Sequence, residues 1–157
     1  KKLTDQVNEK IPLDTERGYH VHFKGHDHLL SRPVIFLNRG FGITPMEQGL
    51  RVVGTVEFGG LNNPVSKKRI QNLVNSAKYL FPELGKHEDE WLGFRPSLPD
   101  FLPVMGPSTK YKNLFYSFGH HHLGWTLGAI SGKIISKMIA GENTNLDLSA
   151  YRSTRFG

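Results

Sequence analysis

Residues 91–106 read WLGFRPSLPDFLPVMG, and residues 113–127 read NLFYSFGHHHLGWTL. In the first segment one arginine, Arg95, is followed by three prolines within eight residues. Proline restricts its own φ and keeps the residue before it out of the α region, so such a frame holds a long side chain in place at low entropic cost. We therefore expect a proline-stiffened loop that presents the Arg95 guanidinium.

The second segment predicts a strand, a turn and a helix, in that order. Residues 114–118 are β-prone, Gly119 ends the run, and a helical pattern begins at Gly124. A helix N-terminus presents free backbone N–H groups and the positive end of the helix dipole, which suits negative charge. One guanidinium and one helix N-terminus on the same stretch indicate a site for a carboxylate and for a group that accepts electron density.

The composition is that of one ordinary domain and excludes several classes of function. The chain has 157 residues, is 38% hydrophobic and contains no cysteine, which excludes disulfides, thiol catalysis and cysteine-based metal sites. No apolar run approaches the ~18 residues of a membrane-spanning helix, and no signal-peptide pattern is recognisable. The net charge is +6, but the basic residues never form a block. A dispersed excess favours a solvated surface over one that binds nucleic acid or lipid.

Upstream of the first segment, the hydrophobic pattern predicts strands joined by short turns. Leu50–Phe58 alternates, which places five residues on one face, namely Leu50, Val52, Gly54, Val56 and Phe58. Extended chain from Ile11 is expected to enter a strand near Arg17. Further strands are expected at 33–37 and 40–46, the second followed by a hairpin turn at 47–49.

Two longer helices are predicted from apolar residues at helical spacing. The stripe of the first, residues 66–81, consists of Ile70, Leu73, Val74, Ala77, Leu80 and Phe81, and Pro82 ends it. The second, residues 124–140, has an apolar ridge of Leu127, Ile130, Ile134 and Met138. Residues 1–10 read as a polar helical start. Early strands, hairpin turns and interspersed helices predict an α+β fold with a mainly antiparallel sheet.

The histidines and glycines contain no complete motif for metal or phosphate. His120, His121 and His122 are adjacent, and neighbours on extended chain point in opposite directions, so the three cannot converge on one ion. We therefore expect no metal site. G-x-G-x-x-G, the P-loop and H-E-x-x-H are all absent from the sequence.

The pairing of RPSLPDFLPVMG (95–106) with GHHHLGWTLGAISG (119–132) resembles the C-terminal part of the D-amino-acid oxidase (DAO) superfamily of flavoproteins. The likeness is nearest to bacterial D-amino-acid dehydrogenases of the small-subunit type, with hydroxyproline dehydrogenases and glycine oxidase close by. Residues 11–22, 44–60 and 147–156 are similar as well, so the resemblance covers nearly all of the chain.

The resemblance implies roles for individual residues. The arginine of the family's G-x-R-P motif binds the substrate carboxylate, and here it is Arg95. The family's turn and helix start contact the flavin, and the corresponding residues are Gly119, His120, His121, His122, Leu123, Gly124, Trp125 and Thr126. Some relatives carry a second arginine where this chain has His122, which could instead touch substrate or fill space. Glu57 is a further candidate, for the substrate amine.

The resemblance also implies that a segment is missing. Family members begin with a Rossmann segment that holds the ADP half of FAD, and we expect this chain to follow it. The implied domains are the end of a flavin-domain helix at 1–10, a substrate-binding domain at 11–92, and a return to the flavin domain at 93–157. By itself the chain is expected to bind FAD poorly, to be inactive and to self-associate through its last helix.

The implied reaction is oxidation of the Cα–N bond of a D-amino acid or hydroxyproline-like substrate by hydride transfer to flavin, giving an imine and then a keto acid and ammonia. No protein general base is needed if the amine binds neutral. The implied location is cytoplasmic, with oxygen or, at the inner membrane, a quinone as electron acceptor and no nucleic acid as partner. Two alternatives remain open, a stand-alone carboxylate-binding module without redox activity and a basic surface that binds nucleic acid or lipid.

Overall fold

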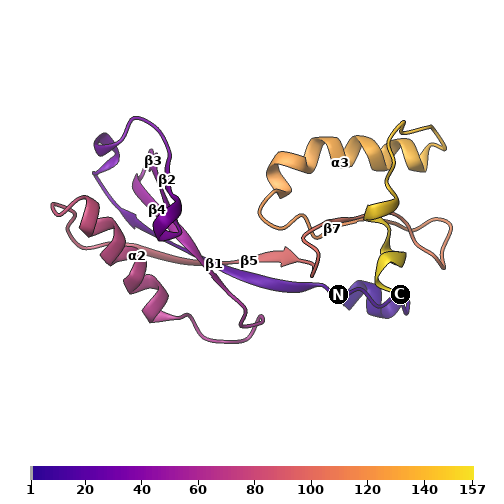
Figure 1. The fold of residues 1–157 in the computed structure, drawn as a ribbon, viewed down its shortest axis with the longest axis horizontal. Helices are drawn as coiled ribbons and strands as arrows, with labels where there is room; N and C mark the ends of the chain where they lie inside the picture. Colours follow the sequence, from indigo (N-terminus) through magenta and orange to yellow (C-terminus); the bar gives the residue numbers. More distant parts are fainter. Residues whose placement is uncertain (1) are drawn as a thin grey trace. The chain divides into compact units, whose positions relative to one another are not determined.

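The computed structural model describes residues 2–157, which divide into two compact units (Figure 1). The central unit is Arg17–Phe94, and the discontinuous unit combines Lys1–Glu16 with Arg95–Gly157. The expected domain boundaries were 1–10, 11–92 and 93–157, and the assignment of each part to substrate or flavin stays a prediction.

One sheet of five strands runs in the order β2-β3-β4-β1-β5. Its strands are β1 (Asp14–Phe23), β2 (Val34–Phe36), β3 (Phe41–Met46), β4 (Gly49–Glu57) and β5 (Asp89–Ser97). The pairs β1/β4, β2/β3 and β3/β4 are antiparallel. The first residues of β1 and the last of β5 belong to the discontinuous unit. The predicted α+β class and mainly antiparallel sheet are confirmed.

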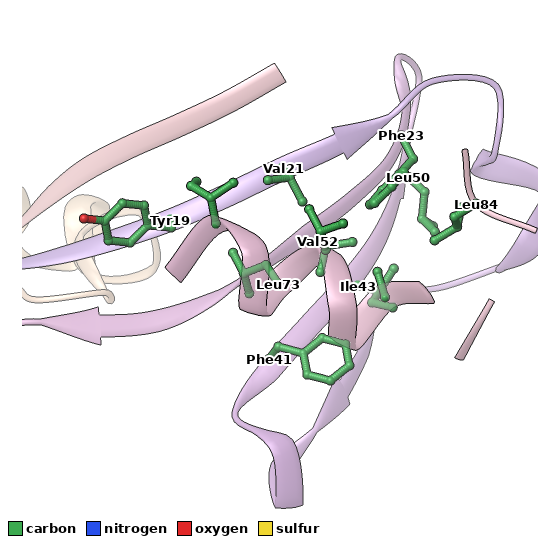
Figure 2. Close-up of a cluster of buried hydrophobic side chains, with 12 residues drawn as sticks. Tyr19, Val21, Phe23, Phe41, Ile43, Leu50, Val52, Leu73 and Leu84 are labelled. Atoms are coloured by element: carbon green, nitrogen blue, oxygen red, sulfur yellow. The ribbon is translucent and has the colours of Figure 1, made fainter. Parts of the chain in front are cut away.

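The core of the central unit lies between this sheet and helix α2 (Lys67–Leu80). Four residues of the predicted stripe are buried, namely Ile70, Leu73, Val74 and Ala77. Figure 2 shows alternate side chains of β1, among them Val21 and Phe23, packed with residues of β3 and β4 and with Leu73. The helix begins after Ser66 and ends before Phe81, as its apolar period predicts.

Strand β4 contains a bulge that overturns part of the predicted face. Arg17 pairs with Glu57 but Tyr19 pairs with Gly54, so β4 has one extra residue here, and Thr55 adopts φ 63°. A bulge shifts every later side chain to the other face. Leu50 and Val52 are therefore buried, whereas Val56 and Phe58 are exposed. The expectation that all five residues share one face was wrong for these last two.

The expected loop around Arg95 is instead the end of strand β5. Trp91 and Phe94 are β-prone, and the proline after Arg95 is tolerated because it lies near the strand's last residue. The turn comes later, at Pro99 and Asp100. Pro96 therefore lies within the arginine's strand, Pro99 and Pro103 follow that strand, and the three prolines do not enclose Arg95 in a loop.

The discontinuous unit packs a hairpin against a long helix. Strand β6 (Val104–Pro107), which the sequence pattern did not predict, pairs antiparallel with β7 (Phe115–Phe118). Helix α3 (Gly124–Ile139) follows, and the short helix α1 (Lys2–Gln6) lies near the start of the chain. Short 3-10 helices cover Asp27–Leu29, Leu37–Arg39, Ser149–Tyr151 and Ser153–Phe156. The predicted ridge of α3 is uneven, since Ile134 is buried while Ile130 is 47% exposed.

Candidate active site

Arg95 lies on the part of β5 that belongs to the discontinuous unit, and its side chain is half-buried. Within residues 2–157 this guanidinium has neither a hydrogen bond nor an ion pair. The next carbonyl, that of Pro96, accepts a hydrogen bond of 3.1 Å from the backbone N–H of His121. The end of β5 is thereby tied to the turn before α3, so the structure brings Arg95 and the predicted turn into one unit.

The turn itself depends on Gly119. This glycine is buried with φ 80°, and a Cβ added to it would lie 2.5 Å from Cδ1 of Leu98. A larger residue would therefore meet both backbone strain and a steric clash. The backbone N–H of Leu123 then donates to the carbonyl of His120 at 2.8 Å, which closes the turn before the helix.

The N-terminus of α3 is open. No side chain among the described residues caps it, and Gly124, Trp125 and Thr126 are all exposed. The first backbone bond of the helix is that from Leu127 N–H to the carbonyl of Leu123, at 2.9 Å. The N–H groups of the first turn are thus left for an external acceptor, beside a glycine that leaves room for a close approach. This arrangement fits the electron-accepting edge of a flavin ring.

The three adjacent histidines make three different contacts. His120 Nε2 lies 2.9 Å from Oγ of Ser131, a buried residue of α3, and burial lowers the pKa of His120. His121 Nε2 lies 2.8 Å from Oε1 of Glu16, and His121 Nδ1 lies 2.9 Å from Nδ1 of His122, which is exposed. The site therefore includes Glu16, which sequence reasoning missed. No local signal marks Glu16, because the same strand contains a second acidic residue, Asp14, and the basic residue Arg17.

Glu57 lies in the central unit and has structural partners. Its Oε2 accepts a hydrogen bond from Tyr19 and lies 3.1 Å from Nε of Arg17, while its Oε1 lies 3.5 Å from Nε of Arg69. The bond from Tyr19, with help from the two arginines, lowers the pKa of the Glu57 carboxyl. Arg17 is fully buried, so Glu57 serves to balance its charge. The expected contact of Glu57 with a substrate amine stays a prediction.

Two negative findings concern residues 2–157. No three histidine, aspartate or glutamate side chains gather there in a way that could hold a metal ion. None of the helices in this part of the chain is both long enough and apolar enough to cross a membrane.

Comparison with known proteins gives consistent matches along the chain. The sequence profile of the DAO family, described as FAD dependent oxidoreductase, matches residues 1–138. A D-amino-acid oxidase of Bradyrhizobium diazoefficiens is 32% identical over 161 residues, which cover 99% of this chain and 38% of that protein. A D-amino acid dehydrogenase of Granulibacter bethesdensis is 34% identical over 158 residues, which cover 98% of this chain and 38% of that protein.

Solved structures agree with these matches. Glycine oxidase from Geobacillus kaustophilus aligns with a TM-score of 0.86 at 26% identity, over 98% of this chain and 42% of that one. L-proline dehydrogenase from P. horikoshii aligns with a TM-score of 0.82 at 17% identity, over 99% of this chain and 43% of that one, which shows the shared fold alone. The chain spans about two fifths of the length of the curated relatives it matches, 38% in both cases above.

Proposed function

The chain belongs to the DAO family of FAD-dependent oxidoreductases, and on that premise we propose that it supplies the substrate-binding and flavin-facing part of an enzyme that oxidises the Cα–N bond of an amino acid. The relatives at 32–34% identity are named for D-amino acids, which favours a D-amino acid as substrate. The product is an imine, which water converts to a keto acid and ammonia.

The observation that carries this proposal is the unpaired, half-buried guanidinium of Arg95. An arginine presents two parallel N–H donors that match a carboxylate, and a lysine cannot reproduce this geometry. Because Pro96 is hydrogen-bonded to His121, a carboxylate held by Arg95 is positioned with respect to the turn before α3. Arg95 therefore orients the substrate, and orientation of a reactive carbon is worth several kcal/mol in such reactions.

The turn and helix start would hold the flavin ring. Gly119, His120, His121, His122 and Leu123 form the turn, and Gly124, Trp125 and Thr126 provide the free N–H groups of the helix. When bound there, FAD supplies the oxidant that takes a hydride from the substrate Cα. The positive end of α3 stabilises negative charge next to these N–H groups. The pyrophosphate and adenine would be held by a Rossmann segment of the same protein, and oxygen or a membrane quinone would take up the electrons.

Steady-state kinetics of Arg95 variants in the complete flavin-loaded protein test the proposal. Loss of a charge-assisted bidentate contact costs about 3 kcal/mol, so Arg95→Ala should lower kcat/KM for an amino acid by on the order of 10². Arg95→Lys should recover only part of this loss. Arg32→Ala, at an exposed arginine whose side chain has no hydrogen bond or ion pair within residues 2–157, is the matched control and should have normal kinetics. Normal turnover by Arg95→Ala would refute the assignment.

A further inference from the structure

Two side chains of the turn before α3 are linked to a buried carboxylate that has no role in binding the substrate carboxylate or the flavin. Glu16 is buried, with 4% of its side chain exposed, and the side chain of His121 beside it is 9% exposed. Their contact of 2.8 Å continues through the 2.9 Å contact between His121 and His122. The three side chains form one hydrogen-bonded line, the Glu16 relay, which leads from the interior to an exposed imidazole next to α3.

The backbone holds the middle of this relay in an uncommon conformation. His121 has φ 58°, in the left-handed region that residues other than glycine seldom adopt. Its N–H donates to the Pro96 carbonyl, and its ring packs edge-on against Phe101 at 4.9 Å between centroids. Strain of this kind persists where several contacts impose it, and such places cluster at functional sites.

The carboxylate at the buried end determines where the hydrogens lie. A carboxylate only accepts, so Nε2 of His121 carries the hydrogen of the bond to Glu16. In a neutral imidazole the other nitrogen is then bare, so Nδ1 of His121 accepts a hydrogen from Nδ1 of His122. Nε2 of His122 is left without a hydrogen, on an exposed side chain, and can accept a proton.

We propose that His122 is the general base that takes a proton from the substrate ammonium group, and that Glu16 and His121 are positioning residues that set its tautomer and stabilise the charge it acquires. This inference rests on the proposed function. An N–H bond of the ammonium breaks, and its proton binds Nε2 of His122. The hydrogen on Nδ1 of His122 passes to Nδ1 of His121. The amine keeps the electron pair that oxidation of its Cα–N bond requires.

The charges around the relay favour this direction of transfer. After the step the positive charge lies on His121, directly against the Glu16 carboxylate. Arg95, on the part of β5 that belongs to the same unit, carries a like charge. Asp100, in the turn after β5, is engaged by Arg155 at 2.6 Å. His120 faces Ser131 and has a pKa lowered by burial, so it does not compete for the proton.

The test is the pH profile of kcat/KM for an amino acid, measured with the complete flavin-loaded protein. In His122→Gln, kcat/KM at neutral pH should fall by about 10² or more. In this variant kcat/KM should rise with pH in proportion to the fraction of substrate whose amine is already neutral. Glu16→Gln keeps the size of the side chain but removes the charge that stabilises protonated His121. In Glu16→Gln the acid limb of the profile, where kcat/KM falls as the pH is lowered, should therefore move to lower pH by about one unit or more. His28→Gln, at an exposed histidine remote from the relay in sequence, should leave the profile unchanged.

A second readout does not depend on turnover. Nitrogen NMR of histidine-labelled protein should show the hydrogen of His121 on Nε2 and that of His122 on Nδ1. A hydrogen on Nε2 of His122, an unchanged acid limb in Glu16→Gln, or a parental profile in His122→Gln would each overturn the relay. If Arg95→Ala loses activity while His122→Gln keeps it, the relay alone is wrong. If Arg95→Ala is normal, the proposed function fails and the relay with it.

Discussion

Glu9, Glu16 and Glu57 are buried or partly buried carboxylates that lie in three different surroundings. Glu57 balances buried Arg17, and Glu16 contacts His121 at the proposed site. The Oε1 atom of Glu9 accepts four hydrogen bonds, from the Ser108 hydroxyl, the Thr109 hydroxyl and the backbone N–H groups of Thr109 and Lys110. Glu9 therefore ties the start of the chain to the turn between β6 and β7, which makes its role structural.

Glu9→Gln should destabilise the chain and weaken the dependence of its stability on acid. Burial raises the pKa of Glu9, but the hydrogen bonds from Ser108 and Thr109 outweigh it and lower that pKa from 4.5 to about 2. A carboxyl with a depressed pKa stabilises the fold above its unfolded pKa, and this contribution is lost as pH falls from about 4.5 to about 2. Urea unfolding should show a loss of about 1–3 kcal/mol at neutral pH.

The control for Glu9 is Glu83→Gln, at an exposed glutamate. This variant should unfold like the parent at neutral pH. The parent should lose more stability than Glu9→Gln when the pH is lowered to about 3. Equal losses in the parent and in Glu9→Gln would contradict the structural role.

Elements whose residues carry their own periodic pattern could be predicted from the sequence. Helices α2 and α3 begin and end within about two residues of the predicted bounds, because each has an apolar period and a clear stop. Strands β5 and β6 carry no such alternation, since prolines and glycines interrupt them. The bulge at Thr55 depends on pairing between β1 and β4, which no local pattern encodes.

The candidate site likewise has residues that could be predicted from the sequence and contacts that could not. Arg95 and the turn from Gly119 to Thr126 each lie in a short sequence motif, so both could be named as candidates from the sequence. Glu16 lies 105 residues from His121, so their contact exists only in the folded chain. The half-buried state of Arg95 and the φ of His121 likewise follow from packing between distant segments.

At the scale of one element, Leu73→Ala tests whether the face of α2 holds the central unit together. Leu73 is 2% exposed and packs in the larger core cluster. Removal of a buried leucine side chain costs about 2–5 kcal/mol through lost transfer energy and the cavity left behind. Lys68→Ala, on the exposed side of the same helix, should change the unfolding free energy by no more than about 0.5 kcal/mol. Similar values for the two variants would show that α2 is not anchored through this face.

At the scale of the whole molecule, the proposed flavin contacts involve one end of the cofactor only, and helix α3 exposes apolar side chains. Trp125 is 101% exposed and Ile130 is 47% exposed, both on α3. An apolar helix face of this kind favours association, with the rest of a longer protein or with a second copy of the chain.

We predict that the 157-residue chain, expressed by itself, retains little FAD and self-associates. Its turn and helix start would contact the ring alone, while the pyrophosphate and adenine would lack their helix N-terminus. Gel filtration with detection of flavin absorbance measures both properties. A monomer that elutes with stoichiometric FAD would contradict the prediction.

The most direct test of the central claim is anaerobic reduction of the flavin in the complete protein, followed by absorbance after rapid mixing. The substrates are a D-amino acid and the amine that lacks its carboxylate. If Arg95 binds the carboxylate, the flavin of the parent protein should be reduced on the order of 10² times faster by the amino acid than by the amine. In Arg95→Ala the ratio of these two rates should fall to near one. A ratio that survives in Arg95→Ala, or a flavin that no amino acid reduces, would contradict the account.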